Sequence, residues 1–174
     1  MVTHLKSNCY ISFPPVKGNV GFVFICPGRF EERAGKPCAG QTGKILEVAL
    51  PFLCALKPNI FLSENRYSYL ITNAWPVVEY KEKTNRSVPT RFEVSAIETV
   101  ARLYAEIKDL QYVVACGNLA HLAVELCKTN HGLKAAVAKA THTSRQAFGC
   151  PTNEELPIRL WEWADQVAKQ FKQV

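Results

Sequence analysis

The chain has 174 residues, 48% of them hydrophobic, which is enough to bury a core and predicts a single domain over residues 1–174. Its net charge of +6 suits a polyanionic partner, although many proteins without one share so modest an excess. The sequence has no long apolar run, and its first residues lack the layout of a signal peptide. A membrane partner is therefore excluded and a cytoplasmic protein is expected.

In the first half of the chain, apolar runs predict two strands separated by a helix. The strands are expected at 19–25 and 67–72, and the helix at 44–56, where Pro51 marks a kink or an early end. Residues 73–90, rich in Pro, Lys and Asn, are predicted to form a long loop whose length indicates a functional role.

The second half continues this alternation, which predicts an α/β fold built on a parallel sheet. Ligands bind such sheets outside the carboxyl ends of the strands, so the segments that follow Ile25, Thr72 and Ala140 are expected around one crevice. The expected elements are a helix at 92–108, a strand at 111–116, a helix at 119–128, a short strand at 133–140, and a last helix at 154–173 with Pro157 in or near its first turn.

The seven cysteines are an odd number and predict no disulfide framework, so we expect reduced and mostly buried thiols. No two of them are spaced as C-x-x-C, which counts against a zinc site or an iron–sulfur cluster, and we expect no metal and no cofactor. The cysteines are Cys9, Cys26, Cys38, Cys54, Cys116, Cys127 and Cys150.

Residues 24–43 are the most informative segment, because a strand-like run opens there into a loop with four glycines before a helical pattern begins. Glycine lets the backbone approach a ligand closely, and the N–H groups of such a loop can face an anion at the helix start. The spacing matches neither a dinucleotide fingerprint nor a loop ending in Gly-Lys-Ser/Thr. A phosphate or base site and a purely structural connection remain equal alternatives.

Further motifs extend the pattern from about Gly21 to about Gln146. In chain order they are Pro27-Gly28, Glu31-Glu32, Gly35-x-Pro37, Gly40-x-x-Gly43, Asn73, Asn85-Arg86 with Pro89, Val113-Val-Ala-Cys-Gly117, and His142-Thr-Ser144. The ordered set resembles the uracil-DNA glycosylase superfamily, closest to its bacterial and archaeal thermostable branch. The resemblance implies a three-layer α/β/α fold with a central, mostly parallel four-stranded sheet. It also implies a monomer that acts on double- or single-stranded DNA.

The activity implied by the resemblance is that of a monofunctional DNA glycosylase, since no matched motif places a lysine to form a Schiff base. Such an enzyme hydrolyses the N-glycosidic bond of a flipped uracil-like or modified pyrimidine and leaves an abasic site. His142 would stabilise negative charge on the departing base, and Asn73 would offer a donor and an acceptor to its pairing edge. Glu31 and Glu32 could position or activate the attacking water, or equally cap backbone N–H groups.

Other positions matched by the motifs are expected around the base and along the DNA. Those around the base are Cys26, Pro27, Gly28, Phe30 and Cys38. Those along the DNA are Gly40, Gln41, Thr42, Gly43, Gly117, Asn118, Ser144, Arg145 and Gln146. Arg145 and Gln146 take the place where relatives insert side chains into the duplex, although an ordinary solvated Arg is an equal alternative.

The chain departs from the family pattern in its pocket. Cys38 stands where a Phe stacks on the flipped uracil, and base–aromatic stacking is worth about 1–3 kcal/mol. Phe30 is a nearby candidate to replace that ring, whereas a bulkier base, such as a glucosylated cytosine of phage DNA, could fill the space instead. Ile25 and Cys26 stand where other branches place a water-activating group, which leaves that group unassigned. The four cluster cysteines of the nearest branch are also missing. The sequence leaves open which base is excised, and whether the role is DNA repair or antiviral defence.

Two other classes of protein fit part of the sequence. A catalytically silent member of the same fold would bind DNA and expose a base without cutting it. The changes at Ile25 and Cys38 favour this reading, and the presence of His142 and Asn73 opposes it. A hydrolase would pair Cys26 or Cys38 as nucleophile with His142 as base, but nothing in the sequence orients such a pair.

Overall fold

Four strands form one sheet in which every neighbouring pair is parallel. The computed structural model describes residues 20–149 and 155–171 and places the strands in the order β2-β1-β3-β4. The strands are β1 (Val20–Phe24), β2 (Leu70–Asn73), β3 (Tyr112–Cys116) and β4 (Ala136–Ala140). The predicted parallel, four-stranded sheet is therefore confirmed, and the register pairs Phe22 with Ile71 and with Val114.

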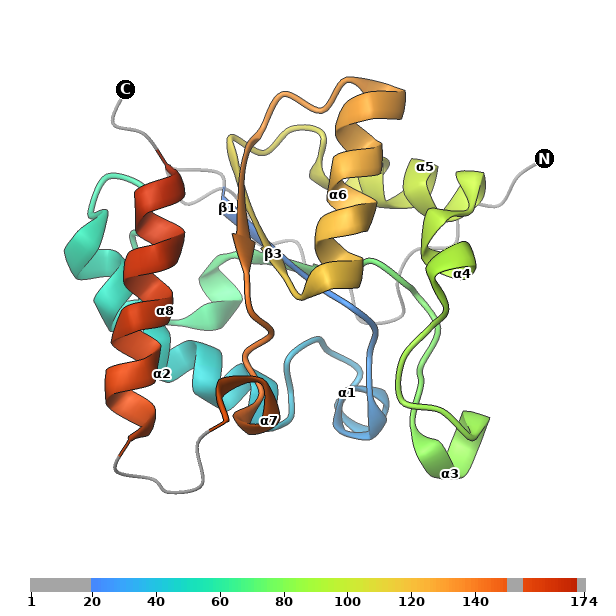
Figure 1. Cartoon of the computed structure of the whole chain (residues 1–174), viewed down its shortest axis with the longest axis horizontal. Coiled ribbons are helices and arrows are strands. Elements are labelled where there is room, and N and C mark those ends of the chain that lie inside the picture. Colours follow the sequence, from blue (N-terminus) through green and yellow to red (C-terminus); the bar gives the residue numbers. More distant parts are fainter. Residues whose placement is uncertain (1–19, 150–154, 172–174) are drawn as a thin grey trace.

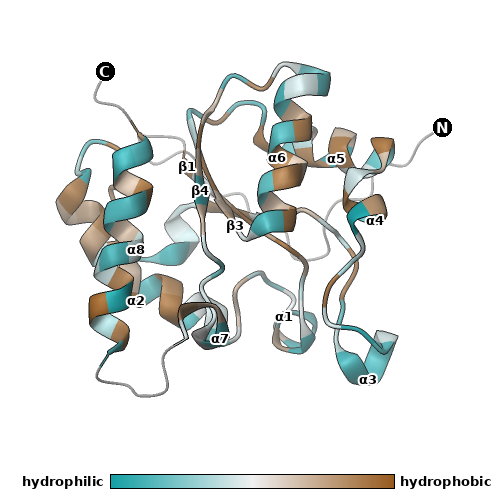
Figure 2. Ribbon diagram, in the orientation of Figure 1, coloured by the Kyte–Doolittle hydropathy of each residue, from teal (hydrophilic) through white to brown (hydrophobic). Residues whose placement is uncertain are grey.

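Helices cover both faces of the sheet and complete the expected three layers (Figure 1). On one face, α2 (Gln41–Leu56) and α8 (Leu156–Gln170) enclose an apolar cluster that includes Phe22 and Leu53. The other face is covered by α4 (Arg91–Ser95), α5 (Ile97–Ile107) and α6 (Asn118–His131). The strands are largely hydrophobic between these layers, whereas α3 (Lys81–Thr84) is hydrophilic and stands apart from them (Figure 2).

Several predicted boundaries are wrong for local reasons. The Asn65 side chain accepts a hydrogen bond from the Tyr67 N–H (2.9 Å), which forms the 3₁₀ turn η1 (Arg66–Ser68) where a strand was expected. Helix α2 continues through Pro51 to Leu56, so the proline does not end it. The predicted helix at 92–108 is divided into α4 and α5 at Ala96, whose ψ of 141° is extended.

Short helices also occur where only loops were expected. They are α1 (Arg29–Ala34), α3 and α7 (Arg145–Phe148). Helix α6 runs three residues beyond its predicted end, to His131, and stops at Gly132 with φ 70°. The outermost predicted ends at Asn19, Glu154 and Gln173 lie outside the described residues.

Candidate functional site

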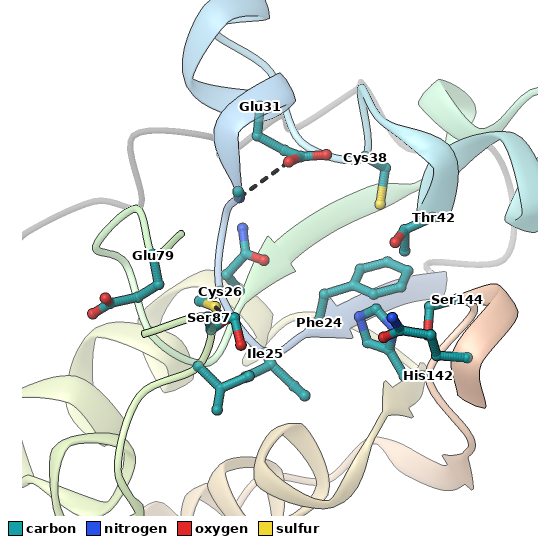
Figure 3. Close-up of a pocket in the computed structure, with 14 residues that line it drawn as sticks. Phe24, Ile25, Cys26, Glu31, Cys38, Thr42, Glu79, Ser87, His142 and Ser144 are labelled. Carbon is teal, nitrogen blue, oxygen red and sulfur yellow. Dashed lines mark hydrogen bonds between the residues drawn. The ribbon is translucent and has the colours of Figure 1, made fainter. Parts of the chain in front are cut away.

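A cavity of about 320 Å³ opens at the carboxyl ends of β1, β2 and β4. Parallel sheets bind ligands at this edge, and the volume is at the lower end of the range of roughly 300–1,000 Å³ for small-molecule sites. Among the predicted positions, the cavity brings together Cys26, Gly28, Glu31, Cys38, Thr42, Asn73, His142, Ser144 and Gln146 (Figure 3). The described lining residues that were not predicted as site residues are Phe24, Ile25, Glu79, Ser87 and Val88.

Asn73 is the last residue of β2, and its side chain lines the cavity. The residue is only 3% exposed, and its Nδ2 atom has no hydrogen-bond partner. An unsatisfied buried donor costs about 1–3 kcal/mol, a cost that an acceptor atom on a ligand would remove. Asn73 is therefore the feature of the cavity that most directly indicates a binding site.

A buried arginine holds the backbone next to the Asn73 side chain. Arg102 of α5 donates from Nη2 to the carbonyl oxygens of Asn73 (2.7 Å) and Ala74 (2.6 Å). Its Nη1 pairs with Glu106 (3.0 Å), which also accepts a hydrogen bond from the Thr72 hydroxyl. The Arg102–Glu106 pair on the inner side of α5 therefore fixes the end of β2. Nothing in the sequence marks it, because Arg102 falls within an ordinary helical pattern.

His142 follows β4 in a loop that two hydrogen bonds attach to neighbouring helices. The Thr143 hydroxyl donates to the carbonyl oxygen of Thr42 (3.2 Å), and Trp163 Nε1 donates to the carbonyl oxygen of Thr141 (2.9 Å). Burial lowers the pKa of His142, and the Glu31 carboxylate acts in the opposite sense. The imidazole is therefore neutral at pH 7 and keeps one N–H donor.

Phe24, not Phe30, supplies the aromatic ring of the cavity. The Phe24 and His142 ring centroids are 5.7 Å apart at 83°, an edge-to-face contact. Phe30 is 59% exposed on α1 and is not a lining residue; its ring packs so close to Gly40 that a Cβ there would lie 3.1 Å from it. Phe24 is the last residue of β1. Because ligands bind at the carboxyl ends of parallel strands, the sequence could have identified Phe24 as the aromatic ring of the site.

The two neighbouring glutamates of α1 lie in different surroundings. Glu31 lines the cavity, and its carboxylate accepts hydrogen bonds from the N–H groups of Gly28 (3.0 Å) and Gly40 (3.1 Å). These glycines are the N-caps of α1 and α2, so Glu31 caps both helices. Capping of backbone N–H groups was the structural role predicted for Glu31 as an alternative to catalysis. Glu32 is outside the lining, where it accepts from the Tyr80 hydroxyl (2.9 Å) and pairs with Lys83.

The two cysteines of the cavity differ in position and in backbone conformation. Burial raises the pKa of Cys26 to about 12, helped by the Glu79 and Glu31 carboxylates. The Cys26 thiol donates to the Ser87 carbonyl oxygen (3.6 Å). Cys38 is 5% exposed and has a φ of 51°, which is rare for a residue with a side chain. Figure 3 shows the Phe24 ring between Cys38 and His142, whereas Cys26 lies apart from both, next to Ser87.

The expected loop at 73–90 forms one wall of the cavity. Its Glu79 side chain is 1% exposed and accepts from Trp75 Nε1 (3.0 Å) and Arg86 Nε (3.0 Å). Hydrogen bonds from Arg86 lower the pKa of Glu79, which is therefore ionised at neutral pH. Ser87 and Val88 complete this wall. No periodic pattern marks these residues, because their position depends on the path of the loop.

The remaining predicted positions lie at helix starts beside the cavity. Gly43 allows close packing of α2, since a Cβ there would lie 1.7 Å from the Cys38 carbonyl oxygen. Gly117 has φ 102° and precedes Asn118, the first residue of α6. Ser144 caps α7 by accepting from the Ala147 N–H (3.3 Å). The predicted residues outside the lining are Pro27, Phe30, Glu32, Gly40, Gln41, Gly43, Gly117 and Asn118. The Arg145 side chain is not among those described.

Searches of protein-family models and of curated protein sequences found no match to this chain. In residues 20–149 and 155–171, no group of three or more His, Cys, Asp or Glu side chains is arranged to hold a metal ion. No helix in the same part of the chain has both the length and the apolar character to cross a bilayer. Among the described cysteines, Cys38, Cys116 and Cys127 are buried, and Cys26 and Cys54 are partly buried. Cys9 and Cys150 lie outside the described residues.

Proposed function

We propose that the protein is a monofunctional DNA glycosylase that hydrolyses the N-glycosidic bond of a pyrimidine flipped out of DNA. One observation carries the proposal: a single cavity is lined by the buried Asn73, whose Nδ2 has no hydrogen-bond partner, and by the neutral imidazole of His142. A flipped base needs donors for its pairing edge, and its release needs a donor where negative charge develops. The net charge of +6 suits DNA as the partner of a monomeric enzyme.

Each side chain has a separate role in this proposal. The Asn73 amide binds the pairing edge of the base, where a base oxygen would accept from Nδ2. His142 donates to the base oxygen on which negative charge accumulates as the bond breaks. The Glu31 carboxylate, fixed by two backbone N–H groups, favours the positive charge that develops on the sugar and can hold the attacking water.

The finer proposal is that the base carries a bulky exocyclic group, as in the glucosylated cytosines of phage DNA. Cys38 presents a small side chain to the cavity, and Ser87 and Val88 in the opposite wall are exposed to solvent. An exocyclic group could therefore leave the cavity past this wall without displacing the buried Asn73. Excision of such bases would serve defence against foreign DNA, whereas excision of uracil would serve repair.

The two rival classes differ in how well they fit the site. A cysteine hydrolase that uses Cys26 is disfavoured because burial raises the pKa of this thiol to about 12, which leaves little thiolate at neutral pH. Cys26 also lies apart from His142 (Figure 3). A silent DNA-binding protein would use the same cavity to hold a base without cutting it, and only an activity measurement separates it from an enzyme.

The test is to incubate the protein with DNA that contains uracil, hypoxanthine or glucosylated hydroxymethylcytosine and to score abasic sites by alkali cleavage. His142→Ala should slow base release about a hundredfold or more, because a donor of this kind contributes roughly 3 kcal/mol. His121→Ala is the matched control, since His121 lies on α6 outside the cavity lining and should leave the rate unchanged.

The outcomes separate the candidates. Cleavage at one base that is lost in His142→Ala and kept in His121→Ala would support the enzyme and identify its substrate. Binding of DNA without cleavage of any substrate would favour the silent protein. A His142→Ala protein that releases base at the native rate would end the role assigned to His142.

A further inference from the structure

The mouth of the cavity carries an apolar side chain that the proposed chemistry does not use. Val88 lines the cavity and is 48% exposed. Among the described residues, it is the only large apolar lining residue that is also exposed. Single exposed apolar side chains are ordinary on protein surfaces, but this one stands where a ligand must enter.

The residues before Val88 are firmly held. The Arg86 guanidinium lies between two carboxylates, with Nε 3.0 Å from Glu79 and Nη1 2.7 Å from Glu93. The Arg86 carbonyl oxygen accepts from the Thr84 hydroxyl (3.2 Å), and that of Ser87 accepts from the Cys26 thiol (3.6 Å). The loop is therefore fixed on the N-terminal side of Val88.

The residues after Val88 are equally fixed. Pro89 is buried and restricts Val88 to an extended backbone. Thr90 and Glu93 form a reciprocal cap at the start of α4, with the Thr90 N–H 2.7 Å from Glu93. Arg86 and Thr90 lower the pKa of Glu93 to about 2, so these bonds persist at neutral pH. A β-branched side chain is thus presented to solvent on a rigid loop, with few rotamers of its own.

We propose that Val88 is a wedge that enters the base stack of duplex DNA at the position vacated by the flipped nucleotide. This inference rests on the proposed glycosylase function. Proteins that deform DNA insert apolar side chains between base steps, and a rigid wedge loses little entropy when it does so. Val88 borders the cavity that would receive the base, so it would lie next to the gap. Gln146, also at the cavity, is exposed but polar and is the alternative wedge.

The test uses a duplex with a central tetrahydrofuran abasic analogue flanked by 2-aminopurine, and the same strand unpaired. We expect Val88→Ala to weaken binding to the duplex at least tenfold more than binding to the single strand, with a smaller 2-aminopurine fluorescence change. Val77→Ala is a matched control, because Val77 is 44% exposed in the same loop but does not line the cavity. It should behave as wild type, and the urea midpoint of each variant verifies folding.

Base release provides the second measurement, with duplex and single-stranded forms of whichever DNA the wild type cleaves. Val88→Ala should reduce the rate on the duplex at least tenfold more than on the single strand. If the wild type cleaves DNA and Val88→Ala keeps the wild-type preference for duplex over single-stranded DNA in both measurements, the wedge is overturned. The proposed glycosylase function would be unaffected by that result. Loss of duplex preference in Gln146→Ala instead would also overturn the wedge. A wild-type protein that neither cleaves nor binds the abasic duplex would overturn both proposals.

Discussion

Asn73 and His142 line the same cavity, but the protein holds them by different means. Asn73 is 3% exposed, and the carbonyl oxygens beside it accept from Arg102, which pairs with Glu106. The Arg102 and Glu106 side chains are only 3% and 7% exposed. The loop that carries His142 is attached by neutral hydrogen bonds from Trp163 and Thr143, and the His142 side chain itself is only partly buried.

The difference indicates a rigid side and a more adjustable side of the cavity. A buried ion pair is costly to desolvate and even more costly to break, so it fixes the backbone it touches. A neutral hydrogen bond contributes only about 1 kcal/mol and can exchange with water when the loop moves. The Asn73 amide is thus preorganised, whereas the loop that carries His142 can adjust when a ligand enters. Three substitutions and a change of pH measure this contrast, and we expect the loss of the buried ion pair to have the largest effect and the protonation of His142 the smallest.

Arg102→Met should have the largest effect, a loss of about 4 kcal/mol in the free energy of unfolding, because the buried Glu106 carboxylate loses the cation of its ion pair. Urea denaturation measures the loss. Arg159→Met is the control, since the Arg159–Glu162 pair is 54% and 46% exposed and should contribute no more than about 1 kcal/mol. Adding Glu106→Leu should restore much of the stability. Equal losses in the Arg102 and Arg159 variants would show that the Asn73 side is not held by its ion pair.

Thr72→Val should cost about 2 kcal/mol, because the shape is kept while Glu106 loses a hydrogen bond to a charged group. Thr129→Val is the control: its hydroxyl donates to the Glu125 carbonyl oxygen (3.2 Å) on the exposed surface of α6. The two urea midpoints should differ clearly. If they coincide, the Thr72 hydroxyl is not part of the support of β2.

The sequence was sufficient for the parts of the fold that depend on periodic patterns. Within residues 20–149 and 155–171, apolar runs located all four strands and the three longest helices. The errors occur where capping decides the structure. Glu31 accepts from Gly28, three residues before it, and from Gly40, nine residues after it. Asn65 forms a turn at Tyr67 despite the strand propensity of that segment. Such contacts depend on one side chain and leave no repeated signal.

The candidate site divides in the same way. Asn73 ends β2 and His142 follows β4, so their meeting could be predicted from the parallel sheet. Helix α1 was not predicted, and its helical geometry places Glu31 at the cavity while Phe30 and Glu32 point away from it. For this reason Phe30 and Glu32 were expected at the site but do not line it. Val88 was not predicted as a site residue, because its place in the cavity wall depends on the ion pairs of Arg86 with Glu79 and Glu93. These pairs form only in the folded loop.

Trp163→Phe tests the adjustable side and should cost about 1 kcal/mol, since it removes the donor to the exposed Thr141 segment while keeping most of the ring. Trp161→Phe is the same substitution on the outer face of α8, where the ring is 49% exposed, and should be nearly neutral. Under the proposed glycosylase function, base release by Trp163→Phe should fall more than its stability loss explains, because His142 is less well placed. A loss in Trp161→Phe as large as in Trp163→Phe would show that the Trp163 hydrogen bond does not hold the His142 loop.

The smallest effect is the pH dependence that His142 gives to stability. Burial lowers its pKa in the folded protein below the ordinary 6.5, so on acidification the unfolded chain takes up this proton first. The stabilisation is complete above pH 6.5 and is lost as pH falls from there through the folded-state pKa, with a slope of at most about 1.4 kcal/mol per pH unit. Urea denaturation between pH 5 and 8 should show a shallower decline in His142→Ala than in wild type. The Asn73 amide has no proton to gain in this range, so Asn73→Ala should retain the wild-type slope even if its stability changes. If Asn73→Ala flattens the profile as much as His142→Ala does, the pH dependence does not originate in the His142 side of the cavity.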